Sequence, residues 1–214
     1  MKIIKLLIIG IAVIAMNSCI GVSADISINA DGSGKIVLEY RLSRMLESLG
    51  RLDGNERKPI IPVGREDFER GVARIPGLSL KSFSSKEARG ADGGRDTVVK
   101  AALDFSDTAA LLAFLDITGS HVSHAGDNGN SLRLVFLEPA SQALNADLVS
   151  LLQEAYSGYE LRISLSAPKT ATLAVSPPSV KTSQLVSQGK KVTFAIDIGD
   201  LLTLPDGLAL EIAW

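Results

Sequence analysis

The sequence is poor in the residue types from which most catalytic and metal centres are built. It has 214 residues but one cysteine, Cys19, and two histidines, His121 and His124. A single cysteine cannot form a disulfide within the chain. Positions three apart in a strand lie on opposite faces, so His121 and His124 would not share a metal ion. We therefore expect no metal site and no cofactor.

Aromatic residues and an excess of charge of one sign are also lacking. Aromatic residues make up 5% of the chain, and 22 Lys and Arg against 24 Asp and Glu leave a net charge of −2. Proteins that bind nucleic acid usually carry a basic excess, so we expect no nucleic-acid partner. The 46% of hydrophobic residues exclude a disordered or coiled-coil chain and are enough for one globular core.

The familiar sequence signatures of catalytic and phosphate-binding sites are missing as well. Ser166 to Lys169 and Ser187 to Lys190 match the Ser-x-x-Lys spacing of acyl-serine enzymes, but both fall at expected strand ends or loops. The segments 31–34 and 127–130 contain Asp, Asn and Gly in a pattern that superficially suggests calcium. They have too few ligands and fit tight turns better. We expect no enzymatic activity and no catalytic residue.

The N-terminus has a short apolar run in place of a membrane span. Lys2 and Lys5 precede eleven apolar or small residues from Leu6 to Met16. A spanning helix needs about 20 such residues. A basic start followed by a short apolar run is typical of a secretory signal peptide, which we place at residues 1–18.

The only cysteine follows this run, directly after Met16, Asn17 and Ser18. The arrangement resembles the lipobox of bacterial lipoproteins, in a relaxed, spirochaete-like form in which Asn17 replaces the usual Ala or Ser. In that family the cysteine becomes the lipidated first residue of the mature protein. The resemblance implies that Cys19 is a lipidation site and that its acyl chains enter the membrane. It also implies a bacterial cell-envelope protein that faces the periplasm or the cell surface.

Two other interpretations of the N-terminus stay open. An ordinary signal peptidase could cut near small residues, at Ala15 and Ser18 or at Val22 and Ala24, and Cys19 would then be a free thiol near the mature start. Alternatively, the apolar run could remain as an N-terminal membrane helix. The acylated cysteine is the interpretation that we carry forward.

Beyond the signal peptide we expect a tether at residues 19–24 and one α+β domain at 25–214. Alternating apolar residues predict hairpins around the turns 31–34, 88–96 and 126–130. The remaining strands are expected at 159–167, 171–175, 192–198 and 208–214. The fold class is therefore a mostly antiparallel sheet built from successive hairpins, with three or four helices on one face.

The helices are expected where apolar residues recur at helical spacing. The pattern predicts helices at 43–49, around Phe68 to Ile75, at 107–116 and at 141–156. The last has the strongest pattern, with these residues facing the core: Leu144, Leu148, Leu151, Leu152 and Ala155. A hairpin followed by a helix occurs three times in this layout, which would fit an internal repeat.

Two segments resemble the domains of LppM-type bacterial lipoproteins. They are the strand-turn opening from Ile26 to Leu42, with Asp31-Gly32, and the late strand from Gly189 to Phe194. That family has an α+β domain with a proposed lipid- or glycolipid-binding role, and the similarity extends over most of residues 24–214. It implies a non-enzymatic, lipid-anchored envelope protein that binds a lipid, a glycan or an envelope partner in a pocket between sheet and helices. The alternative is a structural or assembly subunit of an envelope complex, which would use a sheet edge or hairpin tips.

Overall fold

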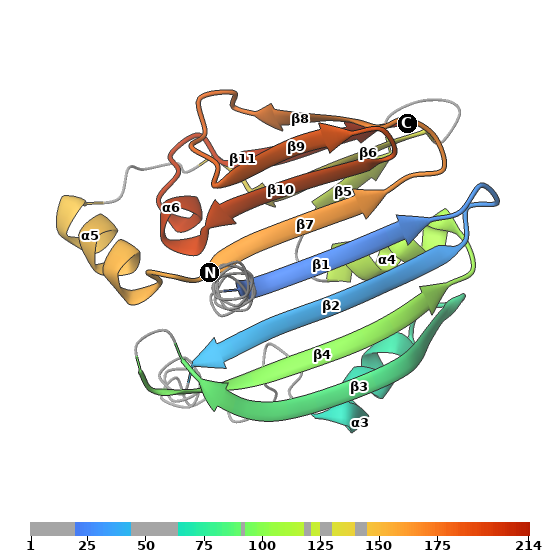
Figure 1. Ribbon diagram of the computed structural model, residues 1–214, viewed down its shortest axis with the longest axis horizontal. Helices are drawn as coiled ribbons and strands as arrows, with labels where there is room; N and C mark the ends of the chain where they lie inside the picture. The colour runs from blue at the N-terminus through green and yellow to red at the C-terminus, as the bar shows by residue number, and fades with distance from the viewer. Residues whose placement is uncertain (1–19, 44–63, 91–92, 118–120, 125–129, 140–144) are drawn as a thin grey trace, which may run out of the picture.

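The structure is a computed structural model that describes residues 20–43, 64–90, 93–117, 121–124, 130–139 and 145–214. They form an α+β fold with two sheets (Figure 1). The larger sheet contains β1 (Ile20–Ile28), β2 (Gly34–Ser43), β3 (Leu78–Arg89), β4 (Arg95–Phe105), β7 (Glu160–Ser166), β9 (Gln184–Gln188) and β10 (Lys191–Asp197). Their order across the sheet is β3-β4-β2-β1-β7-β10-β9.

The smaller sheet contains β5 (His121–His124), β6 (Ser131–Leu137), β8 (Thr172–Ser176) and β11 (Leu208–Ala213). Their order is β5-β6-β11-β8. The α+β class is as predicted, but the strands form two sheets where the sequence pattern suggested one. The reason is that the β5–β6 hairpin pairs with the C-terminal strand β11 and not with the earlier hairpins.

The β1–β2 hairpin forms around the predicted turn. Ile26 pairs with Ile36, and both are buried. In the turn, Asp31 Oδ1 accepts hydrogen bonds from the Ser33 hydroxyl at 2.7 Å and from the Ser33 backbone N–H at 3.0 Å. These bonds hold the pKa of Asp31 below its usual value. Asp31 therefore organises a tight turn, as the sequence indicated.

Strands that are distant in sequence meet at the centre of the larger sheet. β1 pairs with β7 in parallel, with Ile26 opposite Leu165, while the other described strand pairs are antiparallel. β10 then pairs with the other side of β7. The first strand of the domain is therefore held between a local hairpin partner and a strand from the C-terminal third of the chain.

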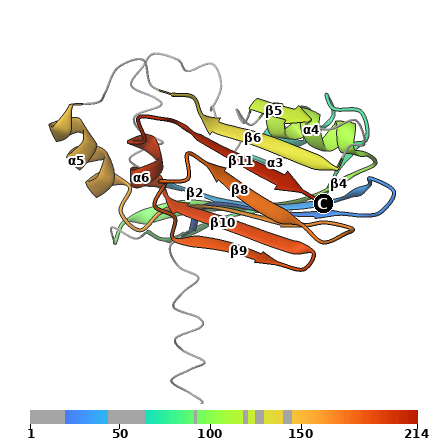
Figure 2. The same cartoon turned by 90° about the horizontal axis from the view of Figure 1, so that it is seen from above.

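Helices α3 (Arg65–Val72) and α4 (Thr108–Ile117) lie on the same side of the larger sheet as the smaller sheet does (Figure 2). Phe68 and Val72 of α3 are buried, as the helical spacing predicted. α4 starts after Asp107, which accepts hydrogen bonds from the Ala110 N–H at 2.9 Å and from the Ser106 hydroxyl at 2.8 Å. These bonds lower the pKa of Asp107 and satisfy an otherwise unpaired N–H of the first turn.

The two sheets share one hydrophobic core. Ile36, Leu103 and Phe194 of the larger sheet and Leu134 and Leu210 of the smaller sheet belong to the same cluster of buried side chains, and none is more than 1% exposed. Burial of apolar surface is the main source of stability in a fold of this kind. The inner face of the larger sheet is therefore covered jointly by the smaller sheet, α3 and α4.

The segment 19–24, expected as a tether, is strand from Ile20 on. Ala24 pairs with Leu38 of β2 and Ile163 of β7 and is buried. Val22 and Ala24 continue the alternation of the hairpin, so the strand extends further towards the N-terminus than expected. Cys19 itself lies outside the described residues.

The helix predicted at 141–156 is present as α5 (Ala146–Ala155), but Leu148 and Leu151 do not face the core, and Leu152 is half-buried. Leu148 is 41% and Leu151 is 61% exposed. α5 lies beyond the ends of the strands (Figures 1 and 2), where no sheet face is available to cover it, and contacts α6 (Ile198–Leu202) instead. The sequence analysis did not predict α6 or β9. The predicted helix at 43–49 and Leu144 fall on residues outside the described ranges, except for Ser43, which ends β2.

Candidate functional site at the Cys19 end

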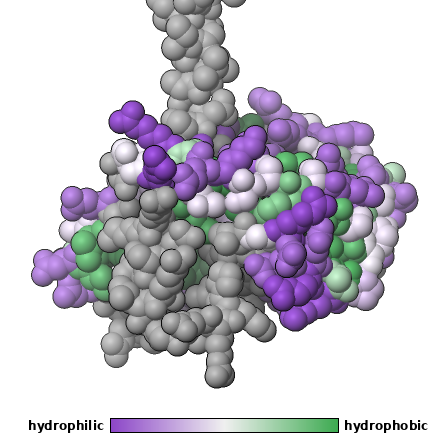
Figure 3. All heavy atoms as spheres, turned by 90° about the horizontal axis from the view of Figure 1, so that it is seen from below, coloured by the Kyte–Doolittle hydropathy of each residue, from purple (hydrophilic) through white to green (hydrophobic). Residues whose placement is uncertain are grey.

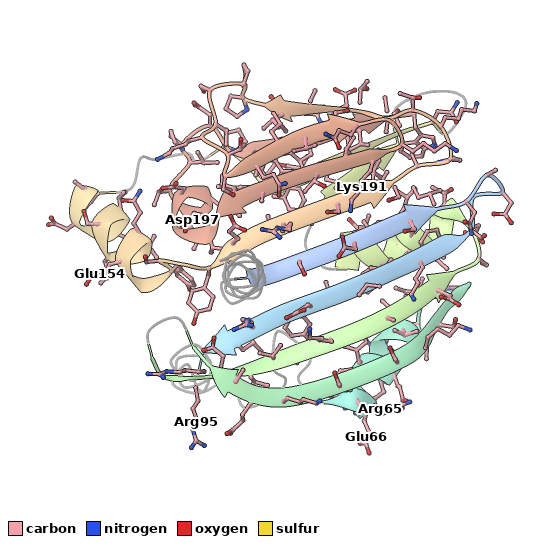
Figure 4. All side chains as sticks on the ribbon, in the orientation of Figure 1. Arg65, Glu66, Arg95, Glu154, Lys191 and Asp197 are labelled. Atoms are coloured by element: carbon pink, nitrogen blue, oxygen red, sulfur yellow. The ribbon has the colours of Figure 1, made fainter. Side chains whose placement is uncertain are left out.

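β1 starts at Ile20, the residue that follows Cys19 in the sequence, at one end of the larger sheet. At this end β1, β4 and β7 start and β2, β3 and β10 finish, as their pairing requires. Figure 4 labels Arg95 at the start of β4, Glu154 on α5 and Asp197 at the finish of β10, all at this end, whereas Lys191 lies at the opposite end. We call the strand termini beside Ile20, together with α5 and α6, the Cys19 end.

A buried hydrogen bond ties the strands together at the Cys19 end. The Tyr159 hydroxyl donates to the carboxyl oxygens of Asp96, at 3.0 and 3.2 Å. Asp96 is 1% exposed, and its carboxyl group would be costly to bury without a donor. The backbone of the same tyrosine accepts a hydrogen bond from the Ile198 N–H at 2.9 Å. Tyr159 therefore connects the base of α5 to β4 and to the start of α6.

α5 and α6 are held together by a close backbone approach. A Cβ at Gly199 would lie 2.8 Å from the Gln153 Cα, so the two helices could not come this near with a larger residue in α6. The Gln153 side-chain amide donates to Asp200 Oδ1 at 3.2 Å. Asn145 caps α5 by accepting from the N–H groups of Asp147 and Leu148. α5 is thus a fixed part of the Cys19 end.

Exposed apolar side chains gather on these two helices. Among the described residues, the exposed large hydrophobic side chains are Val37, Leu148, Leu151, Leu185 and Leu202. Three of these five lie on α5 and α6. In Figure 3 apolar atoms are open to view at the end of the molecule that α5 occupies. Leu148 and Leu151 lie three positions apart on one side of α5, and adjacent exposed apolar side chains mark a contact surface more often than scattered ones do.

Two arginines on the strands next to β1 have unused hydrogen-bond donors near the same end. The Nε atoms of Arg41 on β2 and Arg162 on β7 are buried and have no hydrogen-bond partner among the residues that the structure describes. Arg162 also donates from Nη2 to Glu160 at 2.9 Å. Nothing in the spacing of these arginines along the sequence indicates that they flank the same strand.

The residues that the sequence analysis weighed for catalysis or metal binding do not form a described site. Among the residues that the structure describes, no three or more His, Cys, Asp and Glu side chains are grouped so that they could hold a metal ion. His121 and His124 are the first and last residues of β5. In the Ser187 to Lys190 match, the Ser187 hydroxyl donates to the Ala171 carbonyl at 2.8 Å, which is a structural role between strands.

Three hollows formed by described residues lie at turns and open to solvent. One of about 330 Å³ lies between the 177–181 segment and the residues around α6, one of about 410 Å³ at the β3–β4 hairpin tip, and one of about 380 Å³ at the β1–β2 turn. None of these three lies between the larger sheet and its covering layer, where the sequence analysis placed a binding pocket. No described helix is both long enough and apolar enough to cross a membrane.

Replacing Tyr159 with phenylalanine is expected to lower the free energy of unfolding by about 1–3 kcal/mol, because the buried Asp96 carboxyl loses a donor. Urea denaturation measures the change. Tyr156→Phe is the matched control: Tyr156 is only half buried and its hydroxyl has no described partner, so its effect is expected to stay within about 0.5 kcal/mol. Equal effects of the two variants would contradict the role given to Tyr159.

Comparison with known proteins identifies no family. No protein-family description matches the sequence, and no curated protein is significantly similar to it. Among solved structures, the folded domain of LppM from Mycobacterium tuberculosis is 16% identical, with a TM-score of 0.43 over 92% of this chain and 91% of that one. A putative protease from Parabacteroides distasonis is 9% identical (TM-score 0.36), over 90% of this chain and 39% of that one. An M1 zinc metallopeptidase from Deinococcus radiodurans is 8% identical (TM-score 0.31), over 92% and 42% of the two chains.

Proposed function

We propose that this protein is a lipoprotein of a bacterial cell envelope, with residues 1–18 removed and Cys19 acylated. The domain that follows is a non-catalytic module that binds a lipid, a glycan or an envelope partner. The sequence support is the basic and apolar leader that ends at the only cysteine. The domain would then be held at the membrane by acyl chains, two or more of which anchor a protein firmly.

The observation that carries the proposal is the start of β1 at Ile20. Cleavage before Cys19 leaves every residue of β1 in place. Cleavage after Ala24, one of the two positions open to ordinary signal peptidase, would remove Ile20 to Ala24, which pair with both β2 and β7 at the centre of the larger sheet. Cleavage after Ser18, the other position, would keep β1 whole, as acylation of Cys19 does. The sheet therefore fits a mature protein that begins at Cys19 better than one that begins at Asp25.

Incorporation of radioactive palmitate tests the proposal. The full chain is expressed with its own leader in a bacterial host that processes lipoproteins. We expect the wild-type protein to take up label and Cys19→Ser to take up none, because the serine hydroxyl does not replace the thiol in the thioether linkage. Ser18→Ala, which keeps a small residue before the cysteine, is the control and should remain labelled. An unlabelled wild-type protein, or a labelled Cys19→Ser variant, would contradict the proposal.

A further inference from the structure

We propose that α5 and α6 form a second membrane contact, in which Leu148, Leu151 and Leu202 enter the bilayer interface beside the acyl chains on Cys19. This inference rests on the proposed function, since it takes the acylated cysteine as given. It adds an orientation to the anchored domain: the Cys19 end faces the bilayer, and the opposite end of the sheet, with the β1–β2 turn, faces away.

The first support is the short path from Cys19 to α5. Ile20, the residue after the cysteine, pairs with Glu160 at the start of β7. Only residues 156–159 separate Glu160 from α5, and Tyr159 in that connection is fixed by its bonds to Asp96 and Ile198. One residue of extended chain spans about 3.3 Å. Acyl chains on Cys19 would therefore bring the bilayer surface to the side of α5 without any intervening linker.

The second support is the position and chemistry of the helices. In two perpendicular views α5 projects beyond the ends of the strands at the Cys19 end (Figures 1 and 2). Leu148 and Leu151 lie three positions apart, so they share one side of α5, and both are exposed. Leu202 of the adjoining α6 is 37% exposed. A helix with an exposed apolar side at this place suits the plane of a membrane interface.

The third support distinguishes a bilayer from a protein partner. Acyl chains on Cys19 would hold this end of the sheet against lipid, since Ile20 pairs with Glu160 close to α5. A protein partner could then reach α5 only by displacing the bilayer from it. We therefore assign the contact to phospholipid.

Charge on α5 itself does not hold the helix on the membrane. α5 carries Asp147 and Glu154 and no basic residue. Its contact therefore depends on the apolar side chains and on the anchor that keeps them near the bilayer. We expect a contact that persists in high salt, because screening weakens charge attraction and leaves apolar contacts in place.

A fluorescent label at position 151 tests the contact. Full-length Leu151→Cys protein, expressed with its leader, is reconstituted in vesicles of phosphatidylcholine and phosphatidylglycerol and labelled with bimane. In an acylated protein the Cys19 sulfur is a thioether, so the introduced cysteine is the only free thiol. Leu185→Cys is the matched control, because Leu185 is also an exposed leucine, 51% exposed, but lies on the edge strand β9.

We expect the label at 151 to shift its emission to shorter wavelengths and to lose fluorescence when nitroxide-bearing lipids are added, while the label at 185 does neither. Loss of fluorescence at both positions, or at neither, in protein that is acylated and membrane-bound would overturn the inference and leave the proposed function intact. Wild-type protein that takes up bimane at Cys19 and carries no acyl chains would overturn the proposed function, and the inference with it.

Discussion

Replacing Leu210 with alanine is expected to lower the free energy of unfolding by about 2–5 kcal/mol, the usual cost of removing a fully buried leucine side chain. Leu210 lies in β11, is 0% exposed, and pairs with Leu134 and Val175 on its two neighbours. The shared core places this side chain of the smaller sheet in the same cluster as Leu103 of the larger one. Chemical denaturation monitored by circular dichroism measures the loss.

The shape of that transition tests whether residues 25–214 unfold as one domain. Leu103→Ala in β4 removes an equally buried leucine from the larger sheet. If the sheets share one core, both variants shift a single cooperative transition to lower denaturant. Leu185→Ala on exposed β9 controls for the chemical change and should have a small effect. A common core would be contradicted if Leu210→Ala unfolded in two steps. In that case part of the circular dichroism change would move to lower denaturant, and the rest would keep the wild-type midpoint.

Replacing Gly34 with alanine is expected to destabilise the protein by about 3 kcal/mol, at the upper end for an overpacked site. Gly34 starts β2, opposite Ile28 of β1 and Phe105 of β4. A Cβ here would overlap the Ser27 carbonyl oxygen and the ring of Phe105. Phe105 is 2% exposed and the carbonyl belongs to the neighbouring strand, so neither can move far without disturbing the hairpin. Thermal or chemical denaturation measures the change.

The same substitution at Gly71 is the control, and we expect the opposite sign. Gly71 lies in α3, and a Cβ there would meet no atom within 4 Å. Alanine in a helix is favoured over glycine by about 0.5–1 kcal/mol, because the unfolded chain loses less freedom on folding. Equal destabilisation by Gly34→Ala and Gly71→Ala would mean that the close approach at the β1–β2 hairpin is not as the structure shows it.

The local elements of the fold follow from the sequence where the pattern is strong. Alternation from Ile26 to Leu42 predicts the β1–β2 hairpin, and the Asp31-Gly32 turn predicts where it reverses. Phe68 and Val72 at helical spacing predict α3, and the helix predicted at 107–116 corresponds to α4. These features depend on neighbours within a few residues, which is the range over which turn and capping chemistry acts.

Strand partners across the chain could not be predicted in the same way. The pairing of β1 with β7 and of β6 with β11 joins segments from opposite parts of the sequence. Alternation indicates which side of a strand is buried but not which strand lies next to it. β9 (Gln184–Gln188) was not predicted, because only two of its five residues are apolar.

α5 shows why an amphipathic pattern does not reveal what its apolar side contacts. Leu148 and Leu151 were expected to face the core from their spacing alone. The structure exposes them because α5 leaves the sheet at the Cys19 end and meets α6 instead. The Tyr159–Asp96 bond, between residues 63 positions apart, likewise has no signal in the sequence. The candidate contact surface therefore emerges only when these distant segments are brought together.

If the Cys19 end faces the bilayer, the surfaces left for an envelope partner are the edges of the sheets and the opposite end. β3 and β9 are the edge strands of the larger sheet, and β5 and β8 those of the smaller one. An edge strand offers unpaired backbone groups to an incoming strand. An anchor at Cys19 would thus determine which parts of the domain a binding partner can reach.

Intact-mass spectrometry of the mature protein tests the central claim most directly. The protein is expressed with its own leader in a lipoprotein-processing host and extracted from the membrane fraction, beside Cys19→Ser. The account predicts a mass equal to residues 19–214 plus a diacylglycerol group on sulfur and an acyl chain on the new amino group, absent from the serine variant. A mass without acyl chains, whether the chain is cut elsewhere or keeps residues 1–18, would contradict the lipid-anchored account.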